Sequence, residues 1–137
     1  MARTPGTQPT DGELEILNVL WSAGRADLGA IRAALQQKRP VATTTIATML
    51  KLMRDKGLVD RADGPRGYVW SAKITRKAAR AGLIGRLIDL AFEGSARGLV
   101  AHMLEAGKLS ARDRREIRRL LDEGERKTRA TKGETRS

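Results

Sequence analysis

The 137-residue sequence contains no cysteine and a single histidine, His102. The lack of cysteine excludes disulfides, thiolate catalysis and Cys-based zinc or copper sites. One histidine makes a His-based metal site or a histidine-centred catalytic triad improbable. We therefore expect no cofactor and no bound metal.

Long apolar runs and aromatic residues are also scarce. No stretch approaches the roughly 18 apolar residues of a membrane span, and the first residues, MARTPGTQPTDG, contain no apolar signal core. We expect a cytoplasmic protein that does not bind membranes directly. Aromatic residues make up 3% of the chain, which gives little support to a base-stacking platform for single strands.

Positive charge, by contrast, is abundant. Lys and Arg total 27 against 16 Asp and Glu, which gives a formal charge of +11. A charge of this size on a small protein favours a polyanionic partner such as nucleic acid. The alternative is a solvated basic surface with a basic tail. The sequence offers no convergent acid, base and nucleophile and no phosphate-binding glycine loop, so we do not expect an enzyme.

Two segments with apolar residues at helical spacing open the chain. Thr10 and Glu13 form a capping box for the first helix, which Gly24 ends. Asp27 is suited to cap the second helix. That helix stops before Pro40, because the residue before a proline disfavours helix.

A third helix, TTTIATMLKLMRDKG over residues 43–57, has an unusual outer face. Its apolar positions give one buried stripe: Ile46, Met49, Leu50 and Met53. The opposite face carries small hydroxyl side chains and a lysine: Thr44, Thr45, Thr48 and Lys51. Such a face suits close approach to DNA, where hydroxyls donate to phosphates or base edges. Alternatively, the threonines are ordinary helix caps and the lysine is simply solvated.

The period then changes from helix to strand. Residues 58–62 and 68–72 flank the turn DGPRG and predict a short hairpin that carries Arg61 and Arg66. The hairpin either places Arg66 on the minor groove or phosphate, or only covers the core. Successive side chains of a strand point to opposite faces, so Tyr68 and Trp70 lie on one face and Val69 on the other. We therefore expect one of these two sets to be buried and the other to be partly exposed.

Three helices followed by a basic hairpin outline a winged helix-turn-helix over residues 10–74. The second helix of such a motif lies in the major groove of double-stranded DNA. The predicted DNA-binding residues are Thr43, Thr44, Thr45, Thr48, Lys51, Arg54, Arg61 and Arg66.

Short amphipathic helices resume over residues 75–123, which predicts a helical dimerisation domain. A thin helical segment buries little surface alone, and pairing with a second copy would bury its stripes in a C₂ dimer. The candidate dimerisation residues are Leu83, Leu87, Leu90, Leu99, Val100, Met103, Leu104, Ile117, Leu120 and Leu121. Alternatively, these helices fold back on their own N-terminal domain. Residues 1–9 and 124–137 lack apolar content and are expected to be disordered.

The sequence resembles the penicillinase-repressor family of winged-helix regulators (BlaI/MecI type). The resemblance rests on DGELEILNVLWSAG (11–24), TTIATMLKLMRDKGLV (44–59) and the following GYVWSA, and it extends over about residues 10–123. It implies a homodimeric repressor that binds an operator palindrome. Members are typically released when a membrane metalloprotease sensor leads to cleavage in the dimerisation helices.

This chain departs from the family pattern at several positions. Leu52 stands where members often have a basic residue, and Ala47 where they have a larger one, which implies a different operator. At the family's Asn–Phe cleavage bond this chain has His102 and Met103, the candidate cleavage position. A copper-sensing branch carries a cysteine motif, which is absent here.

The sequence therefore predicts a mainly α protein with a small β-hairpin: a winged helix-turn-helix followed by a C-terminal helical dimerisation domain. We expect a sequence-specific, homodimeric transcriptional repressor. The resemblance implies release by proteolysis in the dimerisation domain, while His102 and Met103 imply either a protease of different preference or no proteolytic release. The alternative function is non-specific binding of nucleic acid by a basic protein. A winged helix that binds only proteins would not need a basic outer face.

Overall fold

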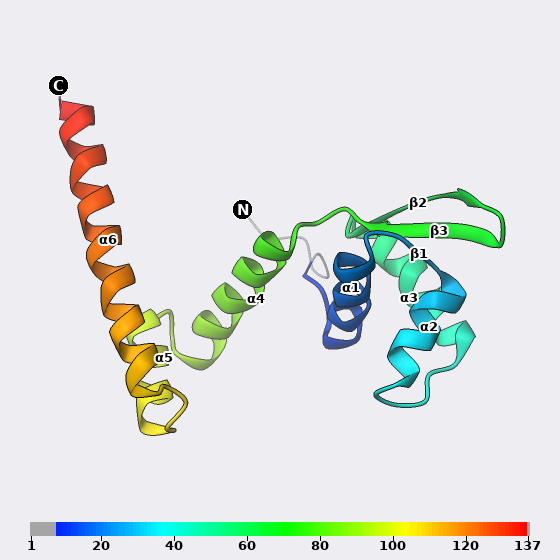
Figure 1. Ribbon diagram of the computed structural model, residues 1–137, viewed down its shortest axis with the longest axis horizontal. Coiled ribbons are helices and arrows are strands. Elements are labelled where there is room, and N and C mark those ends of the chain that lie inside the picture. The colour runs from blue at the N-terminus through cyan, green and yellow to red at the C-terminus, as the bar shows by residue number, and fades with distance from the viewer. Residues whose placement is uncertain (1–7, 137) are drawn as a thin grey trace. The chain divides into compact units, whose positions relative to one another are not determined.

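The computed structural model describes residues 8–136. Its elements, in chain order, are α1 (Asp11–Ala23), β1 (Ala26–Asp27), α2 (Leu28–Gln36), α3 (Thr43–Asp55), β2 (Val59–Gly64), β3 (Gly67–Ala72), α4 (Arg76–Ala91), α5 (Ala96–Glu105) and α6 (Ala111–Arg136) (Figure 1). The predicted fold class, mainly α with a small β component, is confirmed.

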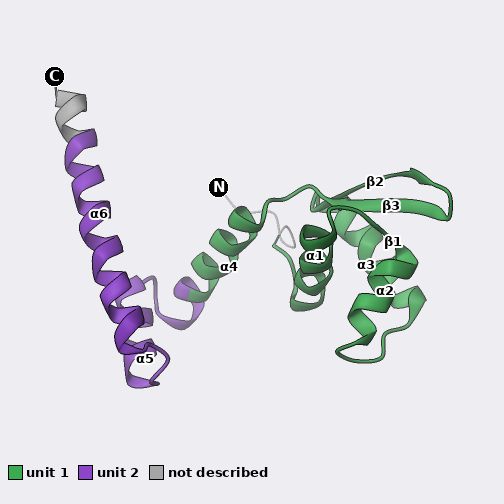
Figure 2. Ribbon diagram, in the orientation of Figure 1, with its two compact units in different colours: residues 1–87 green, residues 88–137 purple. Residues whose placement is uncertain are grey.

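The chain divides into two compact units, one up to Leu87 and one from Ile88 onward (Figure 2). The change of period predicts the boundary at residue 75 instead. The first turns of α4 belong to the first unit because Ala79 is buried there. The indole Nε1 of Trp21 also donates a hydrogen bond to the Ile74 carbonyl at 3.0 Å, which fixes the chain just before α4.

Local sequence signals set the starts of the first two helices. Thr10 and Glu13 form the predicted capping box: the Thr10 hydroxyl accepts from the Glu13 amide, and the Glu13 carboxylate accepts from the Thr10 amide. Gly24, with φ +82°, ends α1. Asp27 caps α2 by accepting from the amide of Ala30 at 2.8 Å.

The end of α3 is set by Gly57. Its φ of +79° lies in the left-handed region that glycine adopts without strain. The Gly57 amide donates to the Arg54 carbonyl, and the Leu58 amide donates to the Met53 carbonyl. This pair of bonds is a Schellman motif, and it turns the chain directly from α3 into β2.

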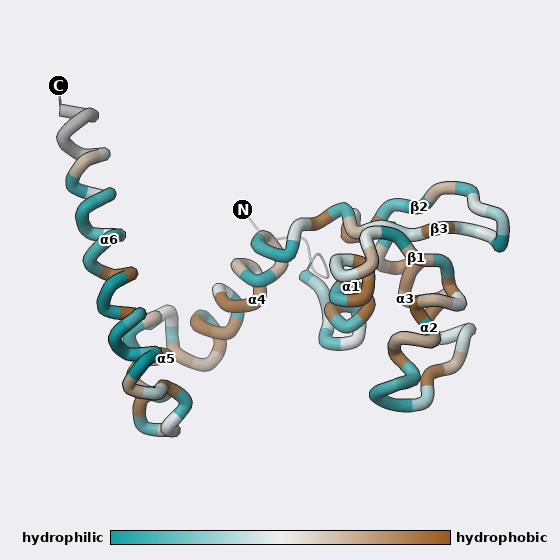
Figure 3. Tube along the Cα trace, in the orientation of Figure 1, coloured by the Kyte–Doolittle hydropathy of each residue, from teal (hydrophilic) through white to brown (hydrophobic). Residues whose placement is uncertain are grey.

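The core of the first unit is built from all three N-terminal helices and the sheet. Helices α1, α2 and α3 each contribute apolar residues spaced three or four apart, as amphipathic helices do. Its largest fully buried side chains are Ile16, Leu17, Leu20, Ile31, Ile46, Leu50, Met53 and Val59. In Figure 3 brown, hydrophobic segments recur in α1 and α4, whereas α6 is mostly teal.

The sheet has one strand more than the sequence predicts. Strands β2 and β3 form the expected antiparallel hairpin, with Pro65 and Arg66 between them, and β1 pairs with β3 to give the order β1-β3-β2. The predicted hairpin is thus confirmed, and the additional strand β1 has two residues, too short for any periodicity to show. Trp70 is buried, Val69 is half-buried and Tyr68 is exposed. The alternation rule therefore holds at Trp70 but not toward the hairpin tip, beyond the core.

The second unit contains α5 and α6. Ser95 caps α5, and Ser110 and Asp113 form a capping box at the start of α6. The expectation of disorder from residue 124 is wrong for residues 124–136, where α6 continues. Arg129 and Glu125 lie one helical turn apart, and their charged groups approach to 2.7 Å. Surface ion pairs of this kind favour a helix without any burial of apolar side chains. Residues 1–7 and 137, also expected to be disordered, lie outside the described residues. Between residues 8 and 136 no helix is both long and apolar enough to cross a membrane.

A buried ion pair links the start of α1 to the end of α3. Residue Glu13 is 3% exposed. Its carboxylate Oε1 lies 2.7 Å from the Nζ of Lys56 and 2.9 Å from the amide nitrogen of Thr10. A buried carboxylate without such partners carries a large desolvation penalty. The pair therefore constrains the relative position of the two helices.

We predict that Lys56→Met destabilises the protein by about 2 kcal/mol, because it leaves the buried Glu13 carboxylate without its cation. The matched control is Lys51→Met, which removes the same charge from an exposed position of α3 and should change stability by less than about 0.5 kcal/mol. Urea unfolding at one fixed protein concentration measures both. Equal effects for the two variants would show that the ion pair contributes nothing specific.

Candidate nucleic-acid interface

Helix α3 has two chemically different faces. Ile46, Leu50 and Met53 are fully buried on the inner face, as the sequence predicts. The outer face is exposed and carries the predicted contact residues of this helix: Thr43, Thr44, Thr45, Thr48, Lys51 and Arg54. Core packing thus fixes the helix from one side and leaves a polar surface free on the other.

The threonines at the start of α3 do not cap it. The N-cap residue is Ala42, and no side chain accepts a hydrogen bond from the first-turn amides. Among the described residues, the threonine hydroxyl of α3 that makes a hydrogen bond is that of Thr48, which donates to the Thr44 carbonyl at 2.9 Å. Helix capping, the alternative role for these threonines, is therefore not what the structure contains.

A hollow lies between α3 and the β2–β3 hairpin. Four of the predicted contact residues line it: Lys51 and Arg54 from α3, and Arg61 and Arg66 from the hairpin. Asp55 is the acidic residue in the same lining, so the hollow carries an excess of positive charge. Its remaining lining is largely apolar and includes Leu28, Leu50, Tyr68 and Trp70.

Aromatic contacts hold Arg61 in place at this hollow. Its guanidinium carbon lies 3.9 Å from the centre of the Tyr68 ring and 5.9 Å from that of Trp70. The two rings meet edge to face at 6.1 Å. Trp70 lies directly opposite Arg61 in the strand register. The cation–π contacts restrict the arginine but leave its N–H groups able to donate to an anion.

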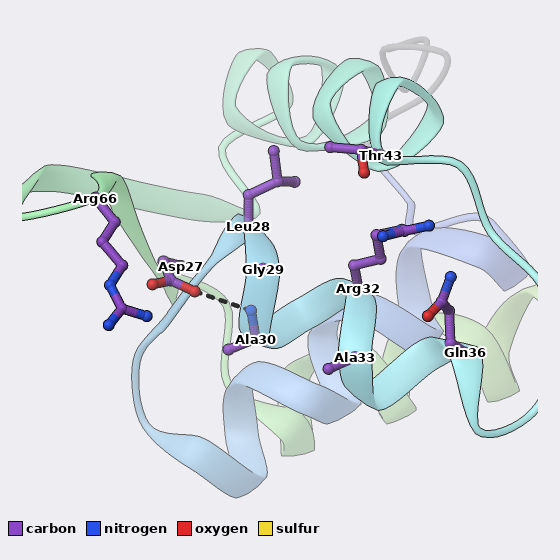
Figure 4. Close-up of a pocket in the computed structure, with 9 residues that line it drawn as sticks. All are labelled: Asp27, Leu28, Gly29, Ala30, Arg32, Ala33, Gln36, Thr43 and Arg66. Carbon is purple, nitrogen blue, oxygen red and sulfur yellow. Dashed lines mark hydrogen bonds between the residues drawn. The ribbon is translucent and has the colours of Figure 1, made fainter.

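A second hollow lies beside the start of α2 (Figure 4). Thr43 and Arg66 line it together with Arg32, which is not among the DNA-binding residues predicted from the sequence. The Nε of Arg32 donates to the Val41 carbonyl at 3.2 Å, just ahead of α3. The signal was available: the first helix of a helix-turn-helix crosses the DNA backbone, so an exposed arginine on α2 is a phosphate-contact candidate. Gln36, one turn further along, lines the same hollow.

The structure therefore brings some predicted contact residues together and keeps others apart. Lys51, Arg54, Arg61 and Arg66 surround one hollow, and Thr43 shares the other with Arg66. The remaining three, Thr44, Thr45 and Thr48, line neither hollow and lie on the open outer face of α3.

The predicted dimerisation residues lie on α4, α5 and α6, and none of them is buried in the single chain. Those exposed to solvent are Leu83, Leu87, Leu90, Val100, Leu104, Leu120 and Leu121. Leu99, Met103 and Ile117 are half-buried. Ile84, which is not among the predicted dimerisation residues, is also exposed, at 46%. At the candidate cleavage position, His102 is exposed and its ring contacts that of Phe92 at 6.0 Å between centroids.

Comparisons with known proteins identify the family of the chain. The model of the penicillinase repressor family matches residues 9–123. The methicillin resistance regulatory protein MecI of Mammaliicoccus sciuri is 22% identical over 113 residues, which are 82% of this chain and 92% of MecI. The penicillinase repressor of Bacillus licheniformis is 23% identical over 116 residues, 85% of this chain and 91% of that protein. The solution structure of the DNA binding domain of the repressor BlaI is 26% identical, with a TM-score of 0.48, over 57% of this chain and 93% of that chain.

The family match spans both units and confirms the resemblance carried by the α1 and α3 sequences. The chain belongs to the penicillinase repressor family, a family of DNA-binding repressors.

Proposed function

We propose that this protein is a homodimeric transcriptional repressor that binds an inverted repeat in double-stranded DNA. Helix α3 enters the major groove of each half-site, and the β2–β3 hairpin lies against the adjacent backbone or minor groove. The observation that carries the proposal is the cationic lining shared by α3 and the hairpin: Lys51, Arg54, Arg61 and Arg66 surround one hollow. Family membership supports the same function.

The start of α3 suits a phosphate. Its first-turn amides have no side-chain acceptor, since Ala42 cannot cap them. Unpaired amides and the helix dipole together favour an anion at such a terminus. Thr43, on this first turn, and Arg32, which lines the same hollow, can add donors to one phosphate. These contacts would position the protein without depending on base sequence.

Exposed leucines support the homodimer. Leu120 and Leu121 are 56% and 66% exposed on α6, and Leu104 is 47% exposed on α5. Each exposed leucine leaves apolar area in contact with water, which association would bury. A C₂ pair would offer two α3 helices to half-sites about one DNA turn, roughly 10 base pairs, apart.

We further propose that repression ends by proteolysis near His102 and Met103, after a membrane metalloprotease sensor responds to a signal. The resemblance to the family motivates this step, and α5 suits it: the helix has no buried residue. A helix with little tertiary packing opens locally at low free-energy cost, and a protease needs an extended segment. Cleavage inside α5 would separate the dimer contacts of α6 from the DNA-binding unit.

Lys51→Gln is expected to weaken binding to the operator and to reduce the slope of log K against log salt by about 0.9, the value for one phosphate contact. The operator is first selected from random DNA with the wild-type protein at physiological salt. Fluorescence anisotropy then measures affinity from low to high salt. Lys108→Gln, with the same charge change between α5 and α6, is the control and should match wild type.

The same selection separates specific repression from non-specific binding. Recovery of an inverted repeat supports the dimeric repressor, and a preference of about 10³ or more over random DNA is expected. Tight binding to every sequence with no recovered motif would instead favour the alternative, a basic protein that binds nucleic acid without reading it.

Leu120→Glu should convert the dimer to a monomer, because each interface would then bury carboxylates without partners. Sedimentation velocity over a concentration series measures the change. The matched control is Leu52→Glu, at a leucine of similar exposure in the DNA-binding unit, 51% against 56%. A Leu120→Glu protein that still sediments as a dimer would place the interface elsewhere.

When the protein is co-expressed with an activated membrane metalloprotease sensor, one new terminus should appear within α5, at or beside His102. Intact-mass spectrometry locates the cut, and a sensor with its catalytic zinc ligands replaced is the control. Replacement of both His102 and Met103 by proline should abolish cleavage there. Loss of repression with the chain intact would exclude the proteolytic route.

A further inference from the structure

Leu52 is an exposed apolar residue on the outer face of the helix proposed to read DNA. It is 51% exposed on α3, while the core on the other side of the helix is completed by Ile46, Leu50 and Met53. From Gln8 to Ala72, the other large hydrophobic residue exposed to this degree is Tyr68. The guanidinium of Arg61 covers that ring at 3.9 Å. Core packing therefore does not account for Leu52.

Leu52 continues a line of methyl groups along α3. Thr45 and Thr48 lie seven and four residues before it, on successive turns of the same side of the helix, and both are exposed. The hydroxyl hydrogen of Thr48 is used within the helix, because it is donated to the Thr44 carbonyl. The line therefore carries apolar groups at all three positions, and the hydroxyl that stays available as a donor is that of Thr45.

Few features of DNA match such a surface. In the major groove every base edge offers hydrogen-bond donors or acceptors, and the apolar group there is the C5-methyl of thymine. A methyl line on a helix cannot make the paired hydrogen bonds by which arginine or asparagine select guanine or adenine. It can bury the thymine methyl against its own methyl groups.

We propose that Leu52, with Thr45 and Thr48, determines specificity for the C5-methyl group of thymine in each operator half-site. The proposal rests on the DNA-reading role of α3 and adds the chemical group that it reads. Lys51, the preceding residue, is assigned a phosphate contact. The half-site is therefore expected to contain thymine at one or more positions facing the second and third turns of α3.

The contact is tested by removing the methyl group from the DNA and, separately, by shortening the Leu52 side chain of the protein. Each thymine of the selected operator is replaced in turn by deoxyuridine, which lacks only the methyl group. Wild-type affinity should fall about fourfold at the contacted thymine of a half-site, the equivalent of one buried methyl group at about 0.8 kcal/mol. With Leu52→Ala the difference in affinity between the uracil and thymine operators should shrink, because the largest apolar partner of the methyl group is gone.

Two further variants divide the line into its parts. Thr45→Ser and Thr48→Ser each remove one methyl group and keep the hydroxyl, and at least one should lower the thymine preference. Thr75→Ser is the matched control: it makes the same change at a residue that caps α4 through its hydroxyl. Thermal melting confirms that the half-exposed Leu52→Ala substitution leaves the fold intact.

Three results would overturn the proposal while leaving the repressor function standing. These are a specific operator without thymine opposite α3, uracil substitutions that all change affinity by less than about 1.5-fold, and an unchanged uracil effect in Leu52→Ala. Failure of the proposed function itself would look different. In that case the wild-type protein would show no preference for any sequence.

Discussion

The arrangement of the first unit depends on one buried carboxylate. Glu13 accepts from its own helix start, through the Thr10 amide, and from Lys56, directly after α3. A charge that is 3% exposed must keep its partners, so the start of α1 and the end of α3 cannot move apart. Because the Schellman turn at Gly57 follows at once, the same contact sets where β2 begins. The distance between α3 and the hairpin, and hence the basic hollow, follows from it.

Helix α3 is a poor helix by its own sequence. Three β-branched threonines fill its first turn, and its N-cap alanine makes no side-chain bond. Tertiary packing compensates, since Ile46, Leu50 and Met53 are fully buried along its inner face. The local cost falls at the residues proposed to approach DNA. This is the pattern expected when function sets a local sequence that stability alone would not select.

Much of this fold could be predicted from the sequence because its signals are local. The capping boxes at Thr10 and Ser110 and the helix ends at Gly24 and Gly57 depend on contacts within a few residues. The features that the sequence did not predict depend on contacts between distant residues or lie in segments too short to show a periodic pattern. Strand β1 forms only because β3 lies beside it. Helix α6 continues past residue 124 with surface ion pairs such as Arg129 with Glu125 in place of apolar burial.

The candidate site, too, could be predicted only where it depends on local sequence. The outer face of α3 follows from the helical period, whereas the convergence of Lys51 and Arg66 on one hollow depends on how the hairpin folds back. Arg32 was missed because its place beside Thr43 depends on the packing of α2 against α3.

The two parts of the site have different chemistry, and this bears on how affinity and specificity are divided. Arginine side chains dominate the hairpin, and Arg61 is already ordered by Tyr68, so less conformational entropy is lost when it binds a phosphate. Phosphate contacts are the same at every base pair. In the proposed complex, sequence preference would therefore come from α3, where hydroxyl and methyl groups outnumber charges. The proposed function therefore assigns binding strength to the hairpin and selectivity to the helix, and substitutions in the two elements should affect different properties.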